Sequence, residues 1–172
     1  IENSNTNERN FLEFNDNNKD VAWIRQMIDK YEQGRQFLYI KTDEDINNYM
    51  EKSGVTNIFS KLCKGPFALI NSLRGGSMDY WQSYLGVEMR KDYGIKTGDI
   101  IHDGGGFYLF PSCKIVYNAM DAGNFLWGRG MRELGFDYID VKAGSQIHNF
   151  LINQRPDSHF DQAAIKAGYH SK

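Results

Sequence analysis

Apolar positions along this chain recur at helical spacing over most of its length. In several segments they fall three or four residues apart, behind a residue that can cap a helix and ahead of a glycine that can end it. The second of these segments starts at Thr42 or Asp43, and the third is capped by Thr56 and broken by Gly65-Pro66. The pattern predicts helices at residues 20–34, 42–54, 56–65, 77–85, 120–134, 139–151 and 160–167.

Two segments have the pattern of strands instead. Residues 36–41 are a short run of β-forming side chains. Between residues 99 and 117, short apolar runs alternate with turn residues, which include three consecutive glycines at 104–106 and Pro111. This second segment predicts a small antiparallel hairpin or meander. Together, the elements predict a single α+β domain that is predominantly helical.

The domain is expected to span residues 20–172, behind a polar, Asn-rich and flexible lead at residues 1–19. The lead lacks the apolar segment of a secretory leader, so we expect the chain to be a cut or expressed fragment. A length of 172 residues and a hydrophobic fraction of 41% suit one globular domain. The longest apolar runs, such as residues 67–70, are too short to span a bilayer. We expect a monomer without a membrane-spanning segment.

The charge balance and the cysteine content limit the classes of function that the chain is expected to have. The chain has 20 basic and 22 acidic side chains, a balance that disfavours broad nonspecific binding to nucleic acid because such binding depends on Lys and Arg contacts to phosphate. Cys63 and Cys113 lie in no CxxC or Cys/His cluster, so no zinc site or disulfide framework is indicated, although one bridge between them stays open. Five basic residues could form a local positive face or an ordinary solvated surface: Arg129, Arg132, Lys142, Arg155 and Lys166.

The common catalytic motifs do not occur in the sequence. It has no GxSxG, P-loop, HExxH or HNH-like pattern, and no GxGxxG after a strand. The glycines at 104–106 are not followed by Lys-Ser/Thr, so they fit a hairpin turn better than a phosphate-binding loop. We expect neither a metal ion nor a cofactor.

Short motifs in the last third give a more specific indication. An Asn-aromatic-x-aromatic-Gly helix precedes a closing Asp-Gln-x-x-Ile element, and a Gly-Gly-x-x-Asp-Tyr segment lies upstream. The motif residues are Gly75-Gly76-Ser77-Met78-Asp79-Tyr80, Ala122-Gly123-Asn124-Phe125-Leu126-Trp127-Gly128, Gly135-Phe136, Ala143-Gly144-Ser145-Gln146, Asp157, Asp161-Gln162-Ala163-Ala164-Ile165 and Gly168. Over roughly residues 70–170 the chain resembles the polymorphic toxin type 44 family.

This resemblance implies a toxin tip of an RHS-type or type VI secreted protein, delivered into a competing bacterium and neutralised by a cognate immunity protein. It also implies a ribonuclease activity, which makes RNA the expected substrate. The chain departs from the family pattern in having Leu126 where many members have His, and Met131 where they have Gly. A mechanism that depends on that His therefore does not carry over.

The candidate site residues in these motifs each have a structural alternative. Asp79 could act as a base or bind a metal, or it could interact with the dipole of a helix that Ser77 caps. Asn124 could bind substrate or be satisfied by neighbouring backbone. Arg129 and Arg132 could clamp a phosphate or solvate one helix face.

A second group of candidates gathers near two predicted helix starts, where an imidazole could move protons while a carboxylate orients it. Its members are Gln146, His148, Asp157, His159, Asp161 and Gln162. Alternatively, Asp157 or Ser158 caps a helix and Asp161 interacts with the helix dipole. The three tryptophans are expected in the core: Trp23, Trp81 and Trp127.

Two functions follow from these patterns. The first is a hydrolase that cuts RNA, with His159 or His148 as general acid or base and Asp161 orienting the imidazole. Asp79 is a further catalytic candidate in that enzyme, and its substrate-binding candidates are Asn124, Arg129, Arg132, Gln146 and Gln162. It predicts a cleft where these side chains converge. The second is an envelope-acting or nonenzymatic toxin that binds a target-cell protein, and it predicts a broad apolar or aromatic surface.

Overall fold

The computed structural model of the chain describes residues 13–15, 38–94, 106–111, 113, 115–153 and 157–171, with the exception of the side chains of 13–15 and 149–153. Several sequence predictions lie outside these residues: most of the lead at 1–19, the helix at residues 20–34, the first part of the hairpin at 99–105, the core position of Trp23 and the basic residue Arg155. The described residues form a predominantly helical structure with a small sheet. This confirms the predicted α+β class.

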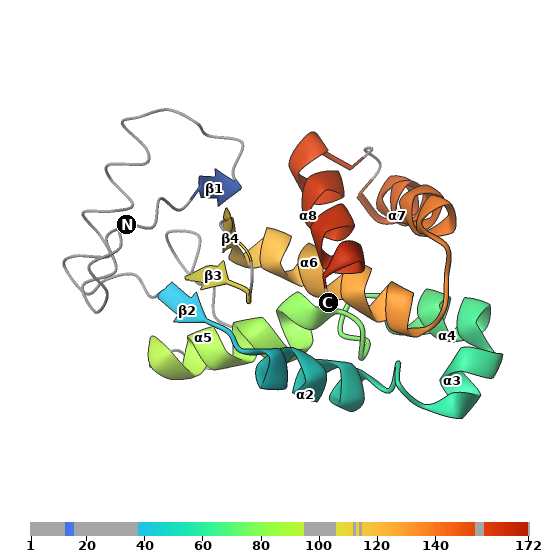
Figure 1. Cartoon of the computed structure of the whole chain (residues 1–172), viewed down its shortest axis with the longest axis horizontal. Coiled ribbons are helices and arrows are strands. Elements are labelled where there is room, and N and C mark those ends of the chain that lie inside the picture. Colours follow the sequence, from blue (N-terminus) through green and yellow to red (C-terminus); the bar gives the residue numbers. More distant parts are fainter. Residues whose placement is uncertain are drawn as a thin grey trace.

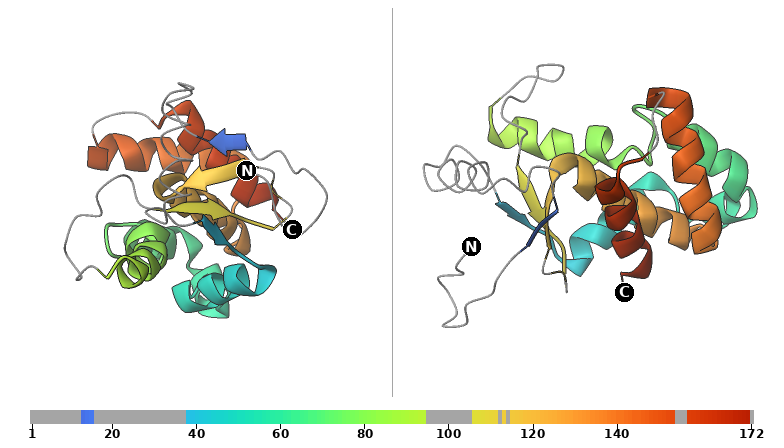
Figure 2. Two further views of the ribbon diagram at one scale, coloured as in Figure 1. Left: turned by 90° about the vertical axis from the view of Figure 1, so that its left-hand side faces the viewer. Right: turned by 90° about the horizontal axis from the view of Figure 1, so that it is seen from above.

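The described elements are short strands and a larger set of helices. The strands are β1 (Glu13–Asn15), β2 (Leu38–Ile40), β3 (Phe107–Leu109) and β4 (Ile115–Asn118). The helices are α2 (Asp43–Ser53), α3 (Ile58–Leu62), α4 (Lys64–Asn71), the π-helix η1 (Trp81–Leu85), α5 (Gly86–Asp92), α6 (Ala119–Glu133), α7 (Tyr138–Asn153) and α8 (His159–His170). Figures 1 and 2 show the sheet near one end of the molecule, with α3, α4 and α7 near the other.

The sheet has four strands in the order β1-β4-β3-β2. Its central strands β3 and β4 are antiparallel, with Tyr108 opposite Tyr117, which confirms the hairpin expected in this part of the chain. Of the outer strands, β2 confirms the strand predicted at residues 36–41, whereas β1 was not predicted and lies in the segment expected to be a polar, flexible lead. β1 pairs parallel to β4, and β2 pairs parallel to β3, so the sheet is mixed and joins segments from distant parts of the sequence.

Helix α2 shows how local residues fix the ends of an element. The Thr42 hydroxyl accepts from the backbone N–H of Asp45 at 3.2 Å, and the Asp45 carboxylate accepts from the N–H of Thr42 at 2.8 Å. Gly54 follows the helix with φ of 80°, a left-handed conformation that glycine adopts without steric cost. Thr42 is therefore the cap, and the predicted end at Gly54 is confirmed.

Three predicted boundaries in the middle of the chain are wrong. Asn57, and not Thr56, caps α3, since its side chain accepts from the backbone N–H of Phe59 at 2.8 Å. Gly65-Pro66 lies in the first turn of α4, where proline is tolerated because the first N–H groups of a helix have no partner within it. The aromatic helix predicted at 77–85 begins with η1 and continues as α5.

Helix α6 runs through the centre of the core. Its buried Phe125 ring stacks on the Phe110 ring, with 4.1 Å between the ring centroids. Leu126 is also fully buried, so its side chain faces the core. The half-buried Trp81 and Trp127 pack against the same core, as predicted.

Helices α6 and α8 cross with their main chains in direct contact. A Cβ atom at Gly128 would lie 2.2 Å from the carbonyl oxygen of Ile165. One at Gly168 would lie 1.8 Å from the carbonyl oxygen of Phe125. Any side chain at either position would force the helices apart. These two glycines belong to the motif series found in the sequence, and close helix packing explains both.

Candidate functional site

The first turns of α6 and α8 each present a carboxyl group fixed by its own helix cap. On α6, the Asn118 side chain accepts from the backbone N–H of Asp121 and donates from Nδ2 to the Asp121 carboxylate, both at 2.9 Å. On α8, Ser158 and Asp161 form a capping box. Reciprocal bonds of this kind hold both carboxyl groups in defined positions.

The two helices bring these carboxyl groups together. Asn124 Nδ2 donates to Asp161 Oδ1 at 2.9 Å, and the Asp121 carboxyl group lies within hydrogen-bonding reach of Asp161. The carboxyl group in the first turn of α8 therefore meets side chains from the first two turns of α6. We call Asp121 and Asp161 the acid pair.

The environment of Asp121 raises the pKa of its carboxyl group toward neutral pH. Asp121 is only 5% exposed, and this burial is the main cause that raises its pKa to about 7. The negative charge of Asp161 and the hydrogen bond to it act in the same direction, whereas hydrogen bonds from Asn124 and Asn118 oppose them. A protonated carboxyl group of this kind can donate a proton.

Replacement of Asp121 by asparagine should change the pH dependence of stability. The pKa of Asp121 rises from 3.8 unfolded to about 7 folded, so its favourable contribution is complete below the unfolded pKa and is lost as the pH rises to about 7. Asp121→Asn removes this loss. We expect the variant to gain stability relative to wild type between about pH 5 and about pH 8 in urea unfolding. An equal difference between the two proteins at both pH values would contradict the raised pKa of Asp121.

Gln162 connects α8 with neighbouring elements. Its Nε2 donates to Ser145 Oγ on α7 at 2.6 Å and also to the Asp157 carboxylate before α8. Its Oε1 is buried and has no hydrogen-bond partner among the described residues. Gln146, next to Ser145, is half-buried. The structure thus brings Gln162 and Asp157 together beside the turn that holds Asp161.

The two histidine candidates make their described contacts with other residues than the acid pair. His148 Nε2 is 3.1 Å from the carbonyl oxygen of Ser72, whose hydroxyl accepts from the Trp127 indole at 2.8 Å. His159 is exposed and stands edge-on to the Phe160 ring. Among the described hydrogen bonds, none links either imidazole to the carboxyl group of Asp161. The expected pairing of an imidazole with Asp161 is therefore not present in this arrangement.

Arg129 and Arg132 bind the opposite end of α8. Both donate to the carbonyl oxygen of Ser171, Arg129 at 2.7 Å, and Arg129 also pairs with Glu133 at 3.0 Å. Ser171 follows Asp161 by ten residues, which at 1.5 Å per residue of helix is about 15 Å. The arginines are thus too distant to stabilise charge that develops at the acid pair. They hold the C-terminal end of α8, where cations are favoured by the helix dipole.

Asp79 makes the contacts of a helix-capping residue. Its Oδ1 accepts from the backbone N–H of Gln82 at 3.2 Å, and its Oδ2 accepts from that of Gly75 at 2.8 Å. Ser77, expected to cap this helix, instead donates to the backbone carbonyl oxygen of Ser53 at 2.8 Å. The carboxylate of Asp79 therefore fixes the turn before η1, and Asp79 does not belong to the acid pair.

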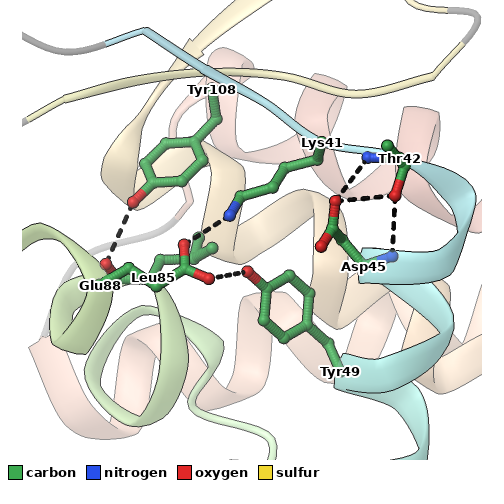
Figure 3. Close-up of polar contacts among 7 residues, drawn as sticks. All are labelled: Lys41, Thr42, Asp45, Tyr49, Leu85, Glu88 and Tyr108. Atoms are coloured by element: carbon green, nitrogen blue, oxygen red, sulfur yellow. Dashed lines mark hydrogen bonds and ion pairs between the residues drawn. The ribbon is translucent and has the colours of Figure 1, made fainter.

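A second polar cluster, which the sequence did not suggest, joins β2 to α5 (Figure 3). Lys41 Nζ and the Tyr49 hydroxyl both contact the Glu88 carboxylate, at 2.5 Å and 2.6 Å. The ammonium group also faces the rings of Tyr39, Tyr49 and Tyr108 at 5.5 to 5.8 Å from their centroids. Because Glu88 neutralises Lys41 and tyrosines enclose it, the cluster has the character of a structural ion pair.

The described residues contain neither a cluster of metal-binding side chains nor a disulfide. Within the described ranges, no three His, Cys, Asp or Glu side chains are grouped as they would be around a metal ion. Cys63 is exposed and Cys113 is half-buried, and both are free thiols. The disulfide that the sequence left open is therefore not formed.

Comparison of the chain with protein-family models, with curated proteins and with solved structures finds no match in any of the three.

The sequence analysis identified one half of the acid pair and missed the other. Asn124 and Asp161 were both candidates from the motif series, and they share a hydrogen bond. Asp121 was not a candidate, because an Asp three residues after Asn118 has the pattern of a first-turn helix residue. The signal that could have found it is its position one helical turn before Asn124, on the same face of the helix.

Proposed function

We propose that this chain is the toxin domain of a bacterial antagonism effector, and that it acts as a hydrolase through the acid pair. The observation that carries the proposal is the convergence of Asp121, Asn124 and Asp161 at the starts of two helices. Asn124 and Asp161 belong to the motifs that resemble the type 44 toxin family. The glycines of the same motifs, Gly128 and Gly168, are what allow the two helices to approach this closely.

The acid pair has the chemistry that hydrolysis of RNA requires. A pair that holds one proton contains a carboxylate that can accept a proton from an attacking hydroxyl, and a carboxylic acid that can donate one to the leaving oxygen. Asp121 is buried and Asp161 is half-buried, so we assign proton retention to Asp121 and the contact with substrate to Asp161. The Asp161 carboxylate accepts the proton of the attacking hydroxyl on one oxygen, and the proton of Asp121 passes through the Asp161 carboxyl group to the leaving oxygen. A second carboxyl group, that of Asp121, thus takes the general acid or base role that the sequence analysis expected of His159 or His148.

The proposed delivery, immunity protein and substrate rest on the resemblance to the toxin family. We propose that the domain is delivered into a competing cell as part of a larger secreted protein, and that a cognate immunity protein neutralises it. The substrate proposal is RNA.

A second candidate function is an envelope-acting or nonenzymatic toxin that binds a target-cell protein. One observation favours it: large apolar side chains of α3 and α4, such as Phe59 and Leu62, are exposed. A surface of this kind is uncommon on a domain that works alone in solution.

Expression in two compartments distinguishes these functions. The wild-type chain is produced inside bacterial cells, either in the cytoplasm or directed to the periplasm, and growth and the integrity of total RNA are followed. We expect growth arrest from the cytoplasm alone, together with breakdown of RNA. Arrest from the periplasm alone would overturn the RNA proposal and support the second candidate.

A further inference from the structure

Helices α3 and α4 turn their large apolar side chains away from the protein. Phe59 and Leu62 on α3 are 75% and 74% exposed, and Leu69 and Ile70 on α4 are both 64% exposed. The residues that these helices bury fully are small, namely Ser60 and Ala68, while Phe67 of α4 is half-buried and packs against the core. A surface helix normally has the opposite arrangement, with its apolar stripe toward the core. We call the exposed set the apolar face, and its members are Ile58, Phe59, Leu62, Leu69 and Ile70.

The segment that carries the apolar face is also basic. From Lys52 to Met78 the sequence contains four basic residues and no Asp or Glu, in a chain whose net charge is −2. Lys64 Nζ donates a hydrogen bond to the carbonyl oxygen of Gly135 and lies over the Phe136 ring. The other three basic residues are exposed: Lys52, Lys61 and Arg74. Along the sequence, exposed positive charge thus flanks the residues of the apolar face.

We propose that the apolar face binds the surface of an anionic lipid bilayer. Apolar side chains on short helices can enter the boundary between headgroups and acyl chains, while neighbouring Lys and Arg side chains bind anionic headgroups. None of the helices described is both long and apolar enough to cross a bilayer. The contact is therefore interfacial, with α3 and α4 lying on the membrane.

The charge of the segment favours an anionic bilayer over a second copy of the chain as the partner of the apolar face. In a symmetric dimer each subunit presents the same patch to its partner, so two basic segments would face one another and repel. An anionic bilayer offers the opposite charge over an apolar interior, which matches both properties of the segment.

Vesicle flotation of the full chain tests the proposal. The probes are vesicles of equimolar phosphatidylglycerol and phosphatidylcholine, and vesicles of phosphatidylcholine alone. We expect flotation with the anionic vesicles, weaker flotation at high salt, and little with the neutral ones. The double variant Phe59→Ser/Leu62→Ser should lower the bound fraction about tenfold or more. Because both side chains are exposed, the variant should fold as wild type does, which near-UV circular dichroism checks.

Matched variants locate the contact. Ile139→Ser/Ile147→Ser removes two exposed apolar side chains from α7, 80% and 61% exposed, and should float as wild type does. Asp121→Asn should also float normally, since membrane binding does not depend on the reaction proposed for the acid pair. An equal loss in the α7 variant would show that the contact is not at α3 and α4.

Two results would overturn the proposal. One is a folded wild-type chain that fails to float with the anionic vesicles. The other is a dimer in size-exclusion chromatography that Phe59→Ser/Leu62→Ser abolishes, because the apolar face would then be covered by a second copy.

Discussion

Gly168→Ala is expected to destabilise the protein by about 3 kcal/mol or more, a large part of the total stability of an ordinary domain. The added Cβ atom would lie 1.8 Å from the Phe125 carbonyl oxygen, and neither main chain can move without separating α6 from α8. Urea unfolding followed by circular dichroism gives the free energy difference. Gly128→Ala, with its Cβ atom 2.2 Å from the carbonyl oxygen of Ile165, should have a similar effect.

Gly144→Ala is the matched control. Gly144 also lies inside a helix, but a Cβ atom there would meet nothing within 4 Å. Because alanine favours a helix over glycine, we expect this variant to gain about 0.5–1 kcal/mol. The same chemical change should therefore have opposite signs at the two positions. Equal effects would mean that α6 and α8 are not in main-chain contact.

Asp121→Asn is expected to reduce toxicity, and RNA cleavage by the purified chain, by about 100-fold or more. Asparagine has nearly the same shape and can still accept the hydrogen bond from Asn118 Nδ2, so the fold should be retained. It cannot hold or release the proton that the acid pair shares. The measurements are survival after induction in cells and the rate of RNA cleavage in vitro.

Asp140→Asn controls for the loss of a helix carboxylate. Asp140 is exposed in the first turn of α7, so its replacement makes the same chemical change at the same kind of helix position, away from the acid pair. We expect full toxicity. Wild-type toxicity in Asp121→Asn would remove the acid pair from the reaction, whatever the substrate. Asp161→Asn is a less clean variant, because an amide cannot replace both acceptor oxygens of Asp161.

Local chemistry made the longer helices predictable. α2, α6 and α8 begin at capping residues that the sequence displays, Thr42, Asn118 and Ser158, and their apolar positions repeat with helical spacing. The boundary near Pro66 was wrong for a local reason too, since proline ends a helix in its interior but is accepted in its first turn. A Gly-Pro dipeptide is thus compatible with the end of one helix and with the first turn of the next, and the sequence alone does not distinguish the two positions.

The site was only partly predictable because it depends on two helices that meet in space. Asn124 and Asp161 came from motifs, whereas Asp121 becomes unusual only when α8 covers it and places Asp161 beside it. Lys41 and Glu88 are 47 residues apart, and no periodicity relates them. The arginine spacing is equally ambiguous, because a spacing that suits a phosphate clamp here places both Arg129 and Arg132 on the Ser171 carbonyl oxygen after α8.

The small sheet has a consequence for how the chain reaches its native state. Glu13 pairs with Ile115 and Leu38 with Phe107, so each outer strand must find a partner across a long stretch of sequence. Closing such loops costs entropy before three-residue strands can return any hydrogen-bond energy. The helices form from contacts close in sequence and need no such search. Strand pairing is therefore expected to complete late, and to set the overall rate of folding.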